Sequence, residues 1–311
     1  MVSAARLVRH GAPLTVEDVD LPDPGPDEVR VQLAFAGVNP VDRYQAEGKV
    51  APDGPCPRTL GGEASGHLDG RPVLVAGGGV GSRRDGVWAE AAVVPRSAVV
   101  PLPEGVDLQA AAAMGVAGLT AWNLARLTGI GAGDRVLVLG ASGGVGQVAV
   151  SLVASLGAQV CGQTGRASKA DAIRAQGADR VVVCDATSLA ETVTDFRPTV
   201  VLDPLGGAYT GAAVSVLEPR GRLGLFGTSA GGEGQVPLQE LYRKGLRVLG
   251  YGGLLLGDEE RREGLSAALE ALADGRLRVA VDRTLPLAQV NDALALFADR
   301  ALSGKVLLRL S

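Results

Sequence analysis

The central part of the chain alternates short apolar runs with segments of helical periodicity. The apolar runs predict strands at residues 135–139, 159–163, 180–184, 199–203, 222–226 and 247–250. Helical patterns between them occupy residues 144–156, 169–176, 188–194 and 209–216. Short buried strands joined by helical crossovers are typical of an α/β protein with a parallel, doubly wound sheet and right-handed connections.

The two ends of the chain follow a different pattern. Residues 28–35 alternate polar and apolar side chains, as a half-buried strand does, and Pro- and Gly-rich turns separate further candidate strands. Those further strands are predicted at residues 72–76, 89–94, 98–101, 279–281 and 305–310, with helices at 259–274 and 287–299. Residues 109–127 are Ala-rich with helical periodicity, and Gly115 and Gly118 predict two helical segments there rather than one.

Composition and charge narrow the class of protein. A chain of 311 residues is long enough for two domains, and 46% hydrophobic with 21% charged residues is typical of a folded protein. The net charge of −4 argues against nucleic-acid or anionic-membrane partners, and no run approaches the ~20 apolar residues of a membrane span. Three widely spaced cysteines and an N-terminus without an apolar leader predict a cytoplasmic protein. We expect these cysteines and His67 to be structural, with Cys161 and Cys184 buried in strands.

A glycine-rich turn follows the first central strand. Gly140, Gly143 and Gly146 have GxxGxxG spacing, and a helical run and a second strand come directly after them. Glycine lets the backbone turn sharply and approach a pyrophosphate, and the start of the helix offers unpaired N–H groups to it. This context predicts dinucleotide binding. The candidate residues within the turn are Gly140, Ser142, Gly143, Gly144, Val145 and Gly146.

The residues after the second strand indicate which dinucleotide is bound. An NAD site normally has an acidic residue there to bind the ribose 2′-OH, but residues 164–169 contain none. Arg166 and Lys169 are instead placed to bind a 2′-phosphate, with Thr164 beside them. The pattern predicts NADPH. The alternative is that both basic residues are solvated positions at the start of the next helix.

Several spaced motifs resemble those of the quinone oxidoreductases and zeta-crystallin, which are zinc-free medium-chain dehydrogenases/reductases. The resemblance covers essentially the whole chain. Its motifs are residues 37–44 (GVNPVDRY), 61–66 (GGEASG), 101–105 (PLPEG), 117–122 (AGLTAW), the glycine-rich turn, Asp203 before Gly206-Gly207, and Gly304-Lys305-Val306. The loop at residues 67–70 is shorter than in most of these relatives, so the substrate does not follow from the resemblance.

The resemblance implies a GroES-like partial β-barrel domain from residues 1–111 and 254–311 and a Rossmann domain from residues 112–253. It implies that Asn39, Tyr44 and Thr120 lie near the nicotinamide and act in catalysis. It places the remaining cofactor contacts at Phe226, Gly227, Thr228, Tyr251, Gly252, Gly253 and Lys305. It also implies a homodimer that pairs the edge strand at residues 247–250. Asn39 could instead be a turn residue before Pro40, and Tyr44 could be a surface residue rather than a proton donor.

No metal site is predicted. The family position of the first zinc-binding cysteine holds Asn39, and the expected Gly-His-Glu reads Gly61-Gly62-Glu63. The two histidines, His10 and His67, are not spaced as a metal pair. We therefore expect Glu63 to be a structural or hydrogen-bonding residue.

The expected function is NADPH-dependent hydride transfer to a quinone or an activated C=C bond. Hydride reaches an electrophilic carbon, and hydrogen-bond donors stabilise the charge on a distant carbonyl oxygen. The alternatives are a pathway-specific enoyl-thioester or enone reductase or tailoring enzyme, and a non-catalytic NADPH-binding protein.

Overall fold

The computed structural model describes residues 1–298 and 302–311, and the chain divides into two compact units. The first unit contains Met1–Leu119, Gly257–Asp274 and Val279–Ser311, and the second contains Thr120–Leu256 and Gly275–Arg278. The predicted domains change at residues 111/112 and 253/254, whereas the units change after Leu119 and Leu256, and Gly275–Arg278 belongs to the second unit rather than the first. Both ends of the chain thus build one unit, and the middle builds the other.

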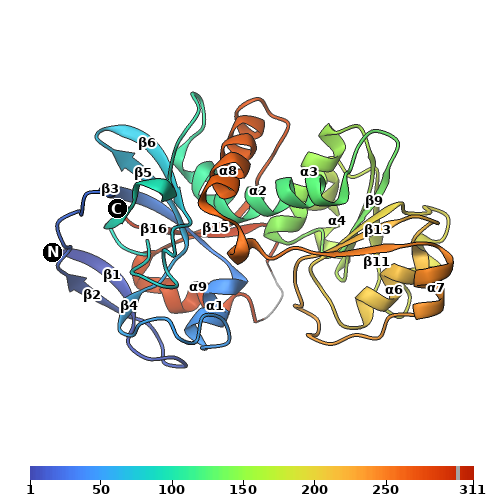
Figure 1. The fold of residues 1–311 in the computed structure, drawn as a ribbon, viewed down its shortest axis with the longest axis horizontal. Coiled ribbons are helices and arrows are strands. Elements are labelled where there is room, and N and C mark those ends of the chain that lie inside the picture. Colours follow the sequence, from blue (N-terminus) through green and yellow to red (C-terminus); the bar gives the residue numbers. More distant parts are fainter. Residues whose placement is uncertain (299–301) are drawn as a thin grey trace. The chain divides into compact units, whose positions relative to one another are not determined.

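The second unit is built on a six-stranded sheet in which all neighbouring strands are parallel (Figure 1). The strand order is β11-β10-β9-β12-β13-β14, the Rossmann order in which the first strand of the unit lies at the centre. Its strands are β9 (Arg135–Val138), β10 (Gln159–Thr164), β11 (Arg180–Val183), β12 (Val200–Asp203), β13 (Arg222–Leu225) and β14 (Arg247–Gly250). The predicted doubly wound sheet is confirmed.

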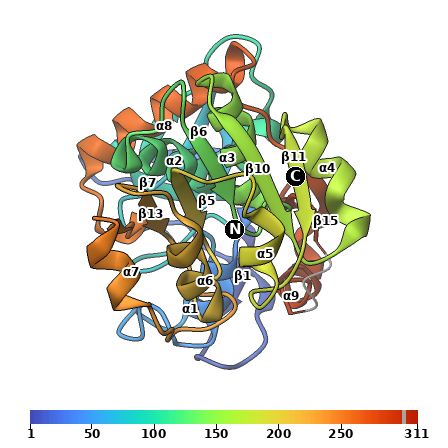
Figure 2. The same ribbon diagram turned by 90° about the vertical axis from the view of Figure 1, so that its right-hand side faces the viewer.

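Helices connect these strands as the periodicity predicts. They are α3 (Gly144–Ser155), α4 (Ala170–Ala175), α5 (Leu189–Val193) and α6 (Ala208–Val216), with α7 (Leu238–Arg243) in addition. Helices α5 and α6 lie side by side (Figure 2). Their apolar side chains, such as Leu189 and Val214, join Leu137, Cys161 and Val201 of the strands in one buried core. The helical periodicity arises because each helix buries one face against the sheet.

The first unit is mostly antiparallel. Its seven-stranded sheet has the order β15-β16-β3-β5-β6-β8, with β7 paired to β3, and β1 lies between β2 and β4 in a separate sheet. The strands are β1 (Val2–Leu7), β2 (Thr15–Val19), β3 (Glu28–Val38), β4 (Arg58–Thr59), β5 (Glu63–Leu68), β6 (Arg71–Ala76), β7 (Ala91–Pro95), β8 (Val99–Pro101), β15 (Val281–Pro286) and β16 (Lys305–Arg309). The C-terminal strand β16 pairs with β3 rather than with the Rossmann sheet, as expected.

Two predicted elements near the C-terminus differ from the structure. The strand expected at residues 279–281 is observed as β15, which starts at Val281 because its partner residues in β16 are Lys305 to Arg309. The helix expected at residues 287–299 is a short 3₁₀ turn at Leu287–Gln289 followed by α9 (Val290–Ala295), and Asp299 lies outside the described residues. Helix α8 (Asp258–Ala273) agrees with the pattern, and α1 (Pro40–Ala46) was not predicted.

The prediction of two segments within residues 109–127 was wrong, because α2 (Leu108–Thr128) is one continuous helix. Its glycines serve packing instead of a break. A Cβ atom at Gly115 would lie 2.4 Å from Oε2 of Glu63, and one at Gly118 would lie 2.3 Å from the sulfur of Met114. A glycine within a helix costs about 1 kcal/mol of stability relative to alanine. At these two positions the missing side chain leaves room for Glu63 and for Met114 of the same helix.

Candidate functional site

Four polar side chains form a buried cluster in the first unit. Glu63 is fully buried, and Asp42, Lys305 and Asn39 are 2%, 3% and 5% exposed. Asn39 directly follows β3 and is the N-cap residue of α1, which contains Asp42. Because β16 pairs Val306 with Val38 of β3, the next residue pair brings Lys305 alongside Asn39. The antiparallel pairing of β5 with β3 brings Glu63 to the same place.

A closed set of hydrogen bonds joins three of these side chains. The Lys305 ammonium donates to Oδ1 of Asn39 at 2.6 Å and to Oε1 of Glu63 at 2.7 Å. The Asn39 amide donates to the same oxygen of Glu63 at 2.6 Å. The other oxygen of Glu63 accepts the backbone N–H of Val116 in α2. The buried negative charge of Glu63 is therefore both paired with Lys305 and hydrogen-bonded.

Two glycines make room for the Glu63 carboxylate. A Cβ atom at Gly37 would lie 2.1 Å from Oε1, and one at Gly115 would lie 2.4 Å from Oε2. Both distances are far shorter than any real contact of a side chain. Glycine is thus required in β3 and in α2 for the same reason, which is the close approach of one carboxylate.

Asp42 is a member of the cluster that the sequence analysis missed. Its carboxylate accepts the backbone N–H of Asn39 at 2.8 Å, which caps the start of α1. Burial raises the pKa of Asp42 to about 7; the Asn39 N–H lowers it, Glu63 raises it and Lys305 lowers it, in that order of size. The spacing of Asn39 and Asp42 is that of a capping box, and it was the signal available in the sequence.

The other two expected catalytic residues do not join this cluster through any hydrogen bond given for the described residues. Tyr44 is a half-buried residue of α1, and its carbonyl accepts the N–H groups of Lys49 and Val50. Thr120 is 8% exposed and lies in α2, at the first residue of the second unit. Their roles remain expectations from the resemblance.

The glycine-rich turn of the second unit has the geometry that a pyrophosphate requires. Gly140 adopts a left-handed conformation with φ of 57°, and Gly143 is the N-cap of α3. A Cβ atom at Gly146 would lie 2.5 Å from the carbonyl oxygen of Gly140, so the helix and the strand approach each other closely only with glycine here. The first N–H groups of α3, from Gly144 onward, have no partner within the helix and can bind an anion.

A buried amide that the sequence analysis missed supports this turn. The side chain of Gln163 accepts the backbone N–H of Gly140 at 3.0 Å and donates to the carbonyl of Cys184 at 2.6 Å. Gln163 is 1% exposed. A glutamine within an otherwise apolar strand was the available signal, because a buried amide needs partners. Through these two hydrogen bonds, Gln163 connects the turn after β9 to the ends of β10 and β11.

The end of β10 carries no acidic residue. Thr164 is buried, Arg166 is exposed and Lys169 is half-buried at the start of the next helix. The nearest acid in the next strand's loop, Asp185, accepts hydrogen bonds from Thr187 and Ser188, which hold its pKa at about 2. These hydrogen bonds use Oδ1 of Asp185 to stabilise the turn at residues 185–188. Binding of a 2′-phosphate by Arg166 and Lys169 stays a prediction.

The remaining candidate cofactor residues also follow strand ends. Phe226, Gly227 and Thr228 come after β13, and Tyr251 and Gly252 come after β14. Because all six strands are parallel, their carboxyl ends lie along one edge of the sheet. The predicted cofactor residues of the second unit thus collect at the edge where such sheets bind ligands.

Buried Asp203 shapes the same edge at the end of β12. One carboxylate oxygen accepts the N–H groups of Leu205 and Gly206, and the other accepts the Thr210 hydroxyl at 2.7 Å. This carboxylate has its partners within the turn, so we assign it a structural role.

A zinc ion does not fit the buried cluster. Among the described residues, no group of three or more His, Cys, Asp and Glu side chains could hold a metal ion. Within the cluster, Glu63 already has both oxygens occupied, and the Lys305 ammonium beside it would repel a cation. Asn39 and Lys305 are not zinc ligands of the usual type.

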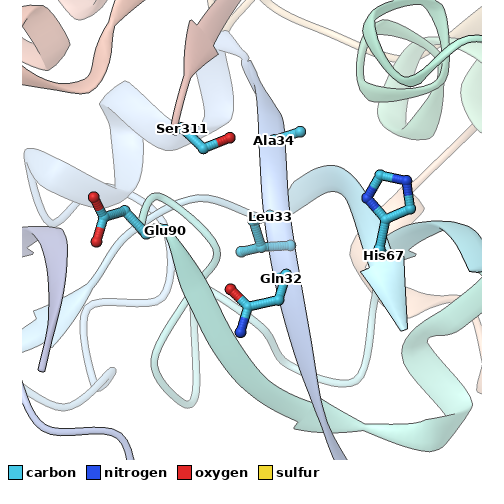
Figure 3. A pocket seen from close by; sticks show the side chains of 6 residues that line it. All are labelled: Gln32, Leu33, Ala34, His67, Glu90 and Ser311. Atoms are coloured by element: carbon cyan, nitrogen blue, oxygen red, sulfur yellow. The ribbon is translucent and has the colours of Figure 1, made fainter. Parts of the chain in front are cut away.

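A surface cavity of about 390 Å³ lies elsewhere in the first unit (Figure 3). It is lined by Gln32, Leu33, Ala34, His67, Glu90 and Ser311. In Figure 3, His67 and Glu90 lie on opposite sides of β3. Glu90 accepts the backbone N–H of Ser3, and none of the candidate site residues lines this cavity.

Comparisons with known proteins agree with this architecture. The family described as zinc-binding dehydrogenase matches residues 144–274. Quinone oxidoreductase 1 of Escherichia coli is 29% identical over 331 residues, covering 99% of both chains. The solved quinone oxidoreductase of Thermus thermophilus, also described in complex with NADPH, is 29% identical with a TM-score of 0.89, covering 99% of this chain and 100% of that one. Across nearly its whole length, the chain is therefore similar in sequence and fold to quinone oxidoreductases, which are medium-chain dehydrogenases/reductases.

The quinone oxidoreductase fold is shared by proteins with other activities. A solved NAD-dependent alcohol dehydrogenase is 28% identical to this chain and has a TM-score of 0.90. The match covers 99% of this chain and 100% of that one. Overall similarity therefore does not decide the cofactor or the substrate. Within the described part of the chain, no helix combines the length and the apolar character that a membrane span needs.

Proposed function

We propose that this protein uses NADPH to reduce a quinone or an activated C=C bond, without zinc. The observation that carries the proposal is the turn from Gly140 to Gly146 combined with an end of β10 that has Arg166 and no acid. When bound, NADPH supplies the hydride. The N-terminus of α3 would bind its pyrophosphate, and Arg166 and Lys169 would bind its 2′-phosphate.

The buried cluster supports a positioning role for Asn39. Its amide nitrogen has two hydrogens and its carbonyl oxygen two lone pairs, of which Glu63 and Lys305 each engage one. Asn39 therefore keeps one N–H donor position while its rotamer is held from two sides. We assign Asn39 the role of orienting the nicotinamide or the substrate, and we assign the role of proton donor to Tyr44 or a water molecule.

The donor set of the cluster supports the proposal that the enzyme works without zinc. Reduction of a conjugated carbonyl places the developing charge on an oxygen that hydrogen-bond donors can stabilise, so a Lewis acid is not required. Purified protein is expected to contain well under one zinc per chain by elemental analysis, and a chelator should leave turnover unchanged. A stoichiometric metal whose removal abolishes turnover would overturn this part of the proposal.

The decisive experiment is NADPH oxidation with a panel of quinones and α,β-unsaturated carbonyls. Turnover with either class supports the proposal and identifies which of the two is reduced. A saturated ketone and a primary alcohol with NADP⁺ serve as controls, because the proposed site offers no Lewis acid for plain alcohol chemistry. NADPH binding without turnover of any panel member would show a binding protein instead.

We also propose that the protein is a homodimer. Strand β14 lies at the edge of the Rossmann sheet, and its residue Val248 is 42% exposed. The following turn exposes Leu254 and Leu255, the latter at 89%. An unpaired edge with apolar neighbours favours pairing with the same edge of a second copy.

A further inference from the structure

Cys56 lies beside a histidine and an arginine of the first unit. It is the exposed member of the three cysteines, while Cys161 and Cys184 are buried. Burial raises the pKa of Cys161 to about 12 and raises the pKa of Cys184, which makes both thiols unreactive. Cys56 is therefore the thiol that outside reagents can reach.

The imidazole of His10 faces Cys56 in an orientation that a base requires. Its Nε2 lies 3.9 Å from the Cys56 sulfur, and its Nδ1 lies 3.0 Å from the carbonyl oxygen of Gln45. A carbonyl oxygen only accepts hydrogen bonds, so Nδ1 carries the proton in the neutral ring. Nε2 then presents its lone pair to the thiol. This is the arrangement of nucleophile, base and orienting group that activates cysteines.

Arg58 adds a buried positive charge next to the same sulfur. Its Nη1 lies 3.6 Å from the Cys56 sulfur and also donates to the carbonyl of Pro55. The side chain is 1% exposed, and its Nη2 has no hydrogen-bond partner among the described residues. Among the described residues, no carboxylate forms an ion pair with Arg58. A buried guanidinium without a counter-ion stabilises negative charge on the neighbouring sulfur when that sulfur attacks an electrophile.

A cavity of about 380 Å³ is present in the loop that precedes Cys56 in the sequence. It is lined by Ala51, Asp53, Gly54, Pro55, Ser82 and Arg83, whereas Cys56 itself does not line it. Asp53 and Arg83 are exposed, so the cavity is open to solvent. Because Cys56 is exposed as well, a small electrophile reaches this loop from solvent.

We propose that Cys56 is a nucleophile, activated by His10 and Arg58, that forms thioethers with α,β-unsaturated carbonyl compounds. The sulfur bonds to the β-carbon, and the C=C electron pair moves to give the enolate. The thiol proton passes to Nε2 of His10 and from there to the α-carbon. The product is a saturated carbonyl adduct of the protein with the full mass of the electrophile added. No electron acceptor is needed, and the step is independent of NADPH.

The test uses the folded full-length protein and N-ethylmaleimide as the probe, followed by intact-protein and peptide mass spectrometry. We expect one adduct, at Cys56, formed about tenfold faster at pH 7 than the adduct of N-acetylcysteine, of which only a few per cent is thiolate. Cys56→Ser should form no adduct in the same time. Reaction at the rate of N-acetylcysteine, or equal labelling of Cys161 and Cys184, would overturn the proposal without any variant of His10.

A matched pair of histidine variants tests the base. His10→Gln should slow labelling of Cys56 about tenfold, whereas His67→Gln, which changes the other histidine of the chain, should leave it unchanged. Unchanged labelling in folded His10→Gln would show that exposure alone accounts for the reactivity. Because the probe needs no NADPH, a protein that fails every reductase assay can still give this result.

Discussion

Lys305 and Glu63 form an ion pair with 2.7 Å between Nζ and Oε1, although the two side chains are only 3% and 0% exposed. Both charges are buried away from water, so each charged group is stable there only while the other neutralises it. Asn39 and the backbone of Val116 supply the remaining hydrogen bonds. The pair connects the C-terminal strand β16 to β5 within the first unit.

Removal of one partner of this pair should be costly. We expect Lys305→Met to lower the free energy of unfolding by about 3–5 kcal/mol, because the Glu63 charge stays buried without a counter-ion. The double variant Glu63→Gln with Lys305→Met should recover most of the loss. Urea unfolding measures both. Arg174→Met removes an exposed ion pair and should change stability by less than about 1 kcal/mol. A single variant as stable as that control would contradict the assignment.

Asp42 should make stability depend on pH. Its pKa in the folded protein is about 7, above the ordinary value of 3.8, so the folded state retains a proton that the unfolded chain releases. The stabilisation that this retained proton gives the folded state is fully present below pH about 4 and is lost as the pH rises through 7. Asp42→Asn removes it, so the stability of the variant relative to wild type should rise between pH 5 and pH 8. Parallel stability profiles for the two proteins would argue against a raised pKa.

Arg166 should distinguish the two nicotinamide cofactors. We expect Arg166→Ala to weaken NADPH binding roughly ten- to hundredfold, the loss typical of a charge-assisted hydrogen bond. NADH affinity should barely change, because NADH lacks the 2′-phosphate. Calorimetric titration with both cofactors measures this, and Arg174→Ala provides a control with another exposed arginine nearby in α4. Equal weakening of both cofactors would mean that Arg166 supports the loop, and a wild-type preference for NADH would refute the assignment.

The edge of the Rossmann sheet should mediate dimer formation. Light scattering at micromolar concentration is expected to give about twice the chain mass of 31.5 kDa. Val248→Lys places a charge on β14 and should shift the protein toward monomers, since a lysine at an edge strand opposes pairing. Val183→Lys, at the opposite edge strand β11, is the control and should remain dimeric. A monomeric wild-type protein would exclude the homodimer.

The sequence by itself determined the architecture of the second unit and the location of its candidate cofactor residues. Each feature there is local. Apolar runs give the strands, helical periodicity gives the crossovers, and the glycines from Gly140 to Gly146 give the turn between β9 and α3. Once neighbouring strands are parallel, the residues after each strand collect at one edge for geometric reasons. The absence of an acid after β10 was likewise visible in the sequence.

Only the tertiary structure decided the contents of the buried cluster and the surroundings of Cys56. Asn39 meets Glu63 across 24 residues and Lys305 across 266 residues, and Cys56 meets His10 across 46. Such contacts depend on the register of strands and loops that are distant in sequence, and no local pattern encodes that register. The same reason explains Gly115, which resembles a helix breaker in the sequence. In the folded protein it is the position where α2 must leave room for the Glu63 carboxylate.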